Sequence, residues 1–325
     1  MVRHERIARN GSSMRVLIVG AGAIGCYVGG LLALARHEVV FAVRSSTADA
    51  MLKSGLHLKG PRGDWNATNI VVHSSPATAA RDFDVGISCV KLYDAESSAR
   101  EWAKLLGQCA AVVSLQNGVD GQQRVAAGSG LKNVYGGLIY VAAKLEGPGQ
   151  IRYLSDMSSI IFGGPGAMQD ATLAELEEAI HILDKKTPFQ AARVEDISSS
   201  QWQKFTALAT NAALTCLVRR PAGVVYQDQA LLDLARQSIA EIVAVGTACG
   251  AHFPPAHEAT TLQFLQGLPA DMVASMHHDL IAGKPLELDG LSGAVVRLGR
   301  THGVPTPFHA MAYACLKPYK DGVMG

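Results

Sequence analysis

The stretch VGAGAIG, residues 19–25, constrains the fold of this chain more than any other part of its sequence. It matches the pattern G-x-G-x-x-G, follows the apolar run RVLI and opens a helical stretch, which is the context that a dinucleotide-binding turn requires. The first glycine permits a tight turn, the second lets the backbone approach a pyrophosphate, and the third lets the helix pack closely on the strand. The alternative is a glycine-rich turn that binds nothing. The residues expected to contact the cofactor are Gly20, Ala21, Gly22, Ala23, Ile24 and Gly25.

The first half of the chain alternates short β-rich runs with helical stretches. Apolar runs such as DVGISCV (84–90) and AVVSLQ (111–116) are typical of strands buried on both faces of a parallel sheet. Residues 133–163 are expected to continue the sheet around a Gly-Pro-Gly turn, in an antiparallel arrangement, before a helix and a last strand near 189–194. The fold class is therefore α/β, a Rossmann-type doubly wound parallel sheet.

After Val194 the strand signals stop, and apolar residues recur at three- and four-residue spacing to the end of the chain. We therefore predict a dinucleotide-binding Rossmann domain over residues 14–194 and an all-helical substrate and catalytic domain over residues 195–325. Residues 1–13 are expected to be a disordered extension or to follow an early start codon, because the pattern begins at Met14.

The basic N-terminus precedes twenty uncharged residues, Val16 to Ala35, and so superficially resembles a signal peptide or a membrane span. Five glycines in this stretch disfavour one continuous helix and favour strand, turn and helix. We therefore predict no membrane association and a cytoplasmic protein.

Charge and cysteine content narrow the possible partners. With 29 Lys+Arg against 28 Asp+Glu, the chain has no electrostatic footprint for nucleic acid or an anionic membrane, so a small molecule is the expected partner. The six cysteines include no C-x-x-C pair and are expected to be reduced thiols, and no metal site is expected. A homodimer is possible.

The choice of dinucleotide is made at the end of the second strand, where an acidic residue would bind a ribose hydroxyl. This chain has Arg44 there, followed by Ser45 and Ser46, and a cation with hydroxyls favours the 2′-phosphate of NADP(H). The alternative is a solvated surface arginine. Lys91 and Asn117 each follow a later strand, at the edge where ligands of open α/β sheets bind, although a strand-end lysine and an Asn-Gly turn need no ligand.

A single lysine, Lys204, interrupts the apolar stretch QWQKFTALATNAAL. On a helix over residues 197–217, Asn211 and Thr215 fall about 20° to either side of Lys204, which gives one polar stripe. That stripe either faces water or lines a cleft, where a desolvated lysine has a lowered pKa and serves as a general acid.

A second polar group lies in ASMHHDLIAGKPLELDG, where Ser275 and Glu287 flank a break at Gly283 and Pro285. Glu287 lies near the start of a helix, where a carboxylate complements the helix dipole without any ligand.

The motifs VGAGAIG, CVK, LQNG, WQK and SMHHDLIAGKPLELDG, in this order from Met14 onward, resemble the ketopantoate reductase (2-dehydropantoate 2-reductase) family. The resemblance implies a Rossmann domain joined to a helical domain, and NADPH-dependent reduction of a 2-oxo acid such as ketopantoate, a step of pantothenate biosynthesis. By position, Lys204 matches the proton-donating lysine, Glu287 the glutamate of the T-E-I-D motif, and Ser275 a substrate-binding serine.

The resemblance also implies a cofactor site. Arg44 and Lys91 match its cations, Asn117 matches the asparagine of the Q-N-G turn that contacts substrate and cofactor, and Glu287 faces a cofactor hydroxyl or Lys204. Ala142 falls where the family lines the cofactor site.

One departure concerns the substrate. The family places asparagines four and eight residues after the lysine, where this chain has Leu208 and Ala212. Asn211 is retained as a substrate-binding candidate, although it is rotated about 100° from the second of these positions. The alternatives are therefore a dehydrogenase of a more apolar 2-oxo or hydroxy acid, and an NADP-binding regulator without turnover.

Overall fold

The computed structural model describes residues 13–67, 69–75, 82–181 and 189–322. The predicted extension lies outside these residues except for Ser13. The chain divides into two compact units. Unit 1 comprises Met1–Val90, Asp94–Gln116 and Gln122–Glu195, and unit 2 comprises Lys91–Tyr93, Asn117–Gly121 and Asp196–Gly325.

Unit 1 is built on a mixed, mainly parallel sheet, which has ten strands over the residues described. Their order is β4-β3-β9-β8-β7-β6-β1-β2-β5, and β10 pairs with β9. The bounds are β1 Arg15–Val19, β2 Glu38–Ala42, β3 Leu56–Gly60, β4 Gly63–Ala67, β5 Ile70–His73, β6 Phe83–Ser88, β7 Cys109–Ser114, β8 Val134–Gly147, β9 Gln150–Gly163 and β10 Gln190–Val194. The strands from β5 to β8 in this order run parallel, and β8 and β9 form the antiparallel pair expected around the Gly-Pro-Gly turn.

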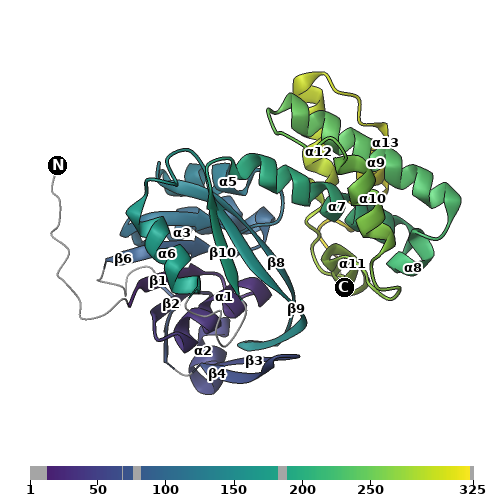
Figure 1. Ribbon diagram of the computed structural model, residues 1–325. Helices are drawn as coiled ribbons and strands as arrows, with labels where there is room; N and C mark the ends of the chain where they lie inside the picture. Colours follow the sequence, from purple (N-terminus) through teal and green to yellow (C-terminus); the bar gives the residue numbers. More distant parts are fainter. Residues whose placement is uncertain (1–12, 68, 76–81, 182–188, 323–325) are drawn as a thin grey trace. The chain divides into compact units, whose positions relative to one another are not determined.

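Helices cover both faces of this sheet (Figure 1). On one face, Val16 and Ile18 of β1 share a core with Leu31 of α1 and Leu176 of α6. On the other, Gly86 of β6 faces α4, where an added Cβ would crowd Leu106. The arrangement is the predicted doubly wound fold. The helices that follow strands of unit 1 are α1 Ala23–Leu34, α2 Ser45–Ser54, η2 Leu92–Asp94, α3 Ala95–Glu101, α4 Ala103–Leu106, α5 Gly121–Ser129 and α6 Ala171–His181.

The described secondary-structure elements of unit 2 are all helices, as the periodicity predicted. Its elements after Glu195 are α7 Ile197–Val218, α8 Ala222–Val225, α9 Gln229–Ala248, α10 His257–Gln266, α11 Ser275–Ile281, η4 Leu288–Gly290, α12 Ser292–His302, α13 Pro307–Leu316 and η5 Lys317–Tyr319.

Helix α7 is the core element of unit 2. It begins where the Asp196 carboxylate accepts the Ser199 N–H at 3.0 Å, and it ends at Arg219 in the left-handed conformation. Its residues enter two apolar clusters, one through Phe205 and Ala212 and the other through Leu214. Because α7 is packed on two sides, a side chain on it is held firmly in place.

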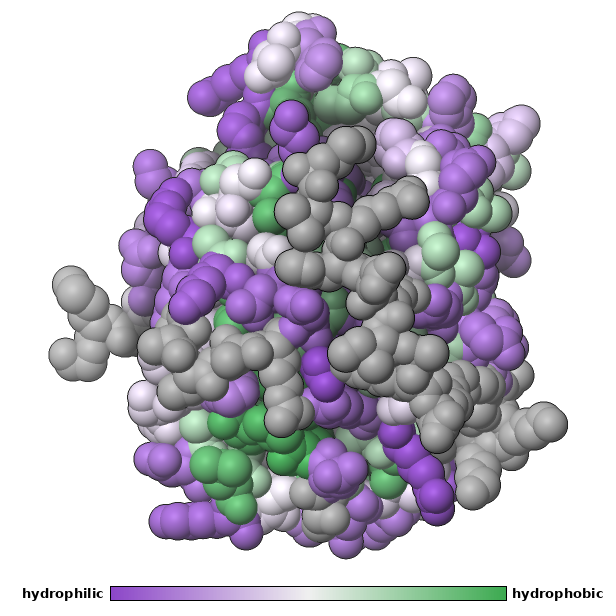
Figure 2. Space-filling view, turned by 90° about the vertical axis from the view of Figure 1, so that its left-hand side faces the viewer, coloured by the Kyte–Doolittle hydropathy of each residue, from purple (hydrophilic) through white to green (hydrophobic). Residues whose placement is uncertain are grey.

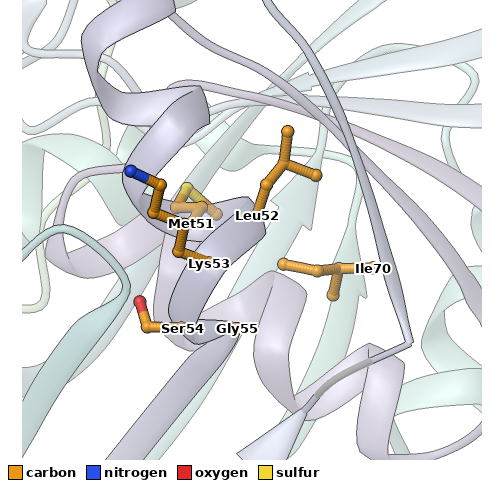
Figure 3. Close-up of a pocket in the computed structure, with 6 residues that line it drawn as sticks. All are labelled: Met51, Leu52, Lys53, Ser54, Gly55 and Ile70. Atoms are coloured by element: carbon orange, nitrogen blue, oxygen red, sulfur yellow. The ribbon is translucent and has the colours of Figure 1, made fainter.

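A small pocket of about 180 Å³ lies in unit 1. Figure 3 shows Leu52 and Ile70 on one side of it, with Lys53 and Ser54 pointing to the other. The end of α2 and the first residue of β5 form the pocket. Since α2 runs back from the carboxyl end of β2, this is the amino edge of the parallel strands, where ligands of open α/β sheets do not bind.

The molecular face in Figure 2 is mostly hydrophilic, with hydrophobic residues gathered in its lower part. Large hydrophobic side chains exposed in unit 1 include Leu52, Val71 and Leu154. Scattered exposed apolar side chains of this kind are normal and mark no site by themselves.

Candidate active site

The glycine turn after β1 is shaped to let backbone approach a ligand. Gly20 has a φ of +98°, and a Cβ there would lie 2.7 Å from Val90 Cγ1. A Cβ on Gly25 would collide with the Gly20 carbonyl oxygen, so the close packing of α1 on the turn also needs glycine. A Cβ on Gly22, in contrast, would meet no atom within 4 Å, and this glycine therefore borders open space.

Gly22 is also the N-cap of α1, and no side chain caps the first N–H groups of that helix. No acidic residue stands in its first turn, so an anion is favoured at this helix end. Ala21, Ala23 and Ile24 are partly buried around the turn. The turn therefore fits the pyrophosphate of a dinucleotide.

Arg44 lies at the neighbouring strand end. The Gly20 N–H donates to the Ala42 carbonyl at 3.0 Å, which ties the glycine turn to the end of β2 two residues before Arg44. Arg44 is exposed and is the N-cap of α2, whose first residues are Ser45 and Ser46. Arg44, Ser45 and Ser46 thus stand at the N-terminus of α2, a place that favours a phosphate.

In unit 2, Lys91 forms an ion-pair cluster with two carboxylates. Lys91 Nζ lies 2.8 Å from Glu287 Oε2 and 3.1 Å from Asp279 Oδ2. The Leu92 N–H donates to Glu287 Oε1 at 3.3 Å. Burial alone would lower the pKa of Lys91, but the two carboxylates raise this pKa above its ordinary value. Lys91 is therefore a stable cation, and the buried Glu287 is its direct partner.

Lys204 has a different environment in the same unit. Its Nζ donates to Asn117 Oδ1 at 3.1 Å. Burial lowers the pKa of Lys204 to about 8, against the opposing effect of the negative charge on Glu287. Unit 2 therefore contains one lysine whose pKa is lowered and another whose pKa is raised.

Leu92 packs the segments of this site together. Gly118 has a φ of +111°, and a Cβ there would lie 2.7 Å from Leu92 Cδ2. A Cβ on Gly290 would collide with the same methyl group. The two glycines leave just enough room for the fully buried Leu92. Because Lys91, Asn117 and Glu287 neighbour these packed residues, the packing fixes their relative positions.

The predicted residues Ser275 and Ala142 lie in unit 2 and unit 1, respectively. Ser275 is the exposed first residue of α11, four positions before Asp279, so both lie on one side of that helix. Ala142 lies in β8 of unit 1, where the pairing register with β9 shifts between Val141 and Ala143.

The side chain of Asn211 has a hydrogen-bond partner other than Lys204. Its side-chain oxygen accepts the Tyr226 hydroxyl at 3.1 Å, and it is only 9% exposed. Thr215 is fully buried, and its hydroxyl donates to the Asn211 carbonyl at 2.6 Å. The stripe predicted from Lys204, Asn211 and Thr215 therefore does not face water. The Thr215 hydroxyl thus bonds the helix backbone and the Asn211 side chain bonds Tyr226, which follows α8, so the substrate-binding role of Asn211 stays a prediction.

Sequence reasoning missed three members of these sites: Asp279, Leu92 and Asp94. For Asp279 a signal existed, because it stands four residues after Ser275, the spacing of neighbours on one helix face. Leu92 contributes by packing, for which a sequence gives no signal. The role of Asp94 depends on a contact with Arg44, fifty residues away in the chain.

No group of three or more His, Cys, Asp and Glu side chains in the described part of the chain is arranged to hold a metal ion. Likewise, none of the described helices combines the length and apolar character needed to cross a bilayer.

Comparison with known proteins identifies the family. A model described as ketopantoate reductase PanE/ApbA matches residues 16–167, and its C-terminal counterpart matches residues 196–320. A 2-dehydropantoate 2-reductase from Archaeoglobus fulgidus is 30% identical over 290 residues, covering 89% of this chain and 92% of that protein.

Solved structures agree with this result. The crystal structure of a PanE/ApbA family ketopantoate reductase from Ralstonia eutropha has a TM-score of 0.84 at 28% identity, covering 94% of this chain and 98% of that one. A ketopantoate reductase from Staphylococcus aureus, described as dimeric, shares the fold with a TM-score of 0.77 at 21% identity, covering 94% and 99%. This chain belongs to the ketopantoate reductase family, whose members are oxidoreductases that act on CH–OH groups.

Proposed function

We propose that this protein is an NADPH-dependent reductase that converts a 2-oxo acid to the 2-hydroxy acid. The observation that carries the proposal is the hydrogen bond of 3.1 Å between Lys204 and Asn117, at a lysine whose pKa is lowered to about 8. When bound, NADPH supplies the hydride that reduces the carbonyl carbon. Lys204 donates the proton that the carbonyl oxygen requires as it becomes an alkoxide.

The other residues have supporting roles in this proposal. Asn117 aims the Lys204 ammonium and, with Ser275, holds polar groups of the substrate. Glu287 fixes Lys91 by an ion pair and opposes further lowering of the Lys204 pKa. Fixed charges of this kind stabilise the developing alkoxide without any reorganisation during the reaction.

The cofactor site belongs to the same proposal. The fold is that of NAD(P)-dependent oxidoreductases. The glycine turn would hold the pyrophosphate and Arg44 the 2′-phosphate, while Ala142 would line the site. Lys91 would add positive charge, although its two carboxylate partners already neutralise much of it. The homodimer and the cytoplasmic location expected from the sequence remain predictions.

Oxidation of NADPH in the presence of a panel of 2-oxo acids tests this function directly. We expect turnover with at least one member of the panel, ketopantoate included. Tight NADPH binding without oxidation by any of them would instead indicate the non-catalytic regulator. If the protein bound neither NADPH nor NADH, both the reductase and the regulator would be excluded.

Arg44 is expected to read the 2′-phosphate. Arg44→Ala should weaken NADPH binding by about 1.5 to 3 kcal/mol, the value of a hydrogen bond to a charged group, and leave NADH binding almost unchanged. Titration of nicotinamide fluorescence measures both dissociation constants. Arg36→Ala is a matched control, because it removes an arginine that follows α1 rather than β2. Equal losses for both cofactors in Arg44→Ala would show that Arg44 does not contact the phosphate.

One observation favours a substrate more apolar than ketopantoate. Leu208 and Ala212 follow Lys204 at four-residue spacing, and both belong to or border the apolar cluster of α7. The nearby amide of Asn211 is already bonded to Tyr226. The hydroxyl of ketopantoate therefore lacks the amide partners that the family pattern provides.

A polar substrate group buried without a partner costs about 1 to 3 kcal/mol, or a factor of roughly 5 to 150 in specificity. We therefore expect a higher kcat/KM for an apolar 2-oxo acid of matched bulk than for ketopantoate, with NADPH saturating. Leu208→Asn should shift this ratio toward ketopantoate. A tenfold preference of the unmodified protein for ketopantoate would contradict the inference.

A further inference from the structure

An ion pair in unit 1 joins Arg44 to Asp94. Arg44 Nη2 lies 2.9 Å from Asp94 Oδ2. Arg44 follows β2, and Asp94 lies in the connection that follows β6. Strands β2 and β6 are the two neighbours of β1 in the sheet. The pair therefore links the chain segments that leave the two strands on either side of the one that carries the glycine turn.

The ion pair between Arg44 and Asp94 is exposed to solvent and can open at little cost. The Arg44 side chain is 80% exposed and that of Asp94 is 36% exposed, and exposed ion pairs contribute little to stability. The Asp94 carboxylate caps no helix, since α3 begins after it without a side-chain hydrogen bond. Only the backbone carbonyl of Asp94 takes part in the local turn, where it accepts the Ser97 hydroxyl at 3.1 Å. Removal of the carboxylate should therefore cost little stability.

We propose that Asp94 is a specificity-determining residue, whose negative charge reduces the preference of this protein for NADPH over NADH. The inference rests on the proposed function, because it requires the dinucleotide to bind with its adenosine end at Arg44. A 2′-phosphate that takes the Arg44 guanidinium displaces the Asp94 carboxylate, which then remains close to a dianion. A ribose 2′-hydroxyl has the opposite effect, because it donates a hydrogen bond to a carboxylate.

The expected size follows from Coulomb's law. A carboxylate several ångströms from a dianionic phosphate in a solvent-exposed setting weakens binding roughly fivefold to twentyfold. Asp94→Asn removes the charge and keeps the shape of the side chain. We therefore expect the dissociation constant of NADPH to fall by this factor, while that of NADH stays the same or rises.

The experiment measures both dissociation constants by nicotinamide fluorescence for the unmodified protein and for Asp94→Asn, without any turnover. A second pair of probes, adenosine 2′,5′-bisphosphate and AMP, isolates the 2′-phosphate and should show the same difference by calorimetry. Glu96→Gln is the matched control, because it removes one negative charge two residues away, where the carboxylate pairs with Arg100 instead. We expect almost no change for this control.

The outcomes separate this inference from the proposed function. If the unmodified protein binds both dinucleotides but Asp94→Asn leaves the ratio of the two constants unchanged, the role of Asp94 is wrong and the reductase proposal stands. An equal gain for NADPH in Glu96→Gln would also overturn it, because the effect would then reflect net charge alone. If the unmodified protein binds neither dinucleotide, the proposed function itself fails.

Discussion

Turnover of the Lys204→Ala variant is expected to be roughly 10²- to 10⁴-fold lower than that of the unmodified protein, the usual contribution of a general acid. The reason is that burial lowers the pKa of Lys204 to about 8, and Asn117 accepts a hydrogen bond of 3.1 Å from its ammonium. Steady-state NADPH oxidation with the best 2-oxo acid of the panel measures this loss. NADPH affinity should be retained, because the glycine turn and Arg44 are untouched.

Thermal stability provides the control for this variant. Burial disfavours the charged form of Lys204, so removing the ammonium relieves a cost that the folded protein bears in full below about pH 8 and to a decreasing extent above it. Lys204→Met keeps the aliphatic stem and its packing, and it should melt no lower than the unmodified protein while remaining as inactive as Lys204→Ala. A folded Lys204→Met variant with full activity would exclude Lys204 as the acid.

The pH dependence of reduction should show a single descending limb set by Lys204. The pKa of this group is lowered to about 8 by burial, so the ammonium is present below that pH and is lost above it. For reduction, kcat/KM should therefore be level below about pH 8, fall about tenfold for each further pH unit, and be roughly 300-fold lower by pH 10.5. Oxidation of the 2-hydroxy acid needs the neutral amine and should rise over the same range.

Lys204→Arg identifies the group responsible for this limb. Arginine stays protonated throughout the range, so the residual activity of this variant should not fall near pH 8. Lys91 should not contribute, because its carboxylate partners raise its pKa above the ordinary value. The same limb in Lys204→Arg would assign the titration to another residue.

The sequence predicted the parallel core of unit 1 because buried strands such as β6 and β7 are apolar on both faces. It indicated no strand at β4, an edge strand that is short and carries polar residues such as Asp64 and Asn66. Strands at a sheet edge are held by backbone pairing and are only partly buried. Their side-chain pattern therefore resembles that of a loop.

The site was predictable wherever a residue acts through its own local context. The glycine turn is such a case, because a positive φ at Gly20 and the contact of Gly25 with the turn are set within six residues. Lys204 is another, because one charge in an apolar helix is conspicuous. The sequence did not indicate the partner of Asn211, since helical geometry gives the direction of a side chain and not the residue, Tyr226, that it meets.

By itself the sequence determined the fold class, the dinucleotide turn, the family and the lysine that is proposed to donate the proton. These follow from short patterns, whose residues interact with their own neighbours in the chain. Only the tertiary structure decided that Glu287 and Asp279 hold Lys91, that Leu92 packs against Gly118 and Gly290, and that Asp94 pairs with Arg44. The physical reason is that charge pairing and close packing act over a few ångströms in space, between residues that folding brings together from distant parts of the chain.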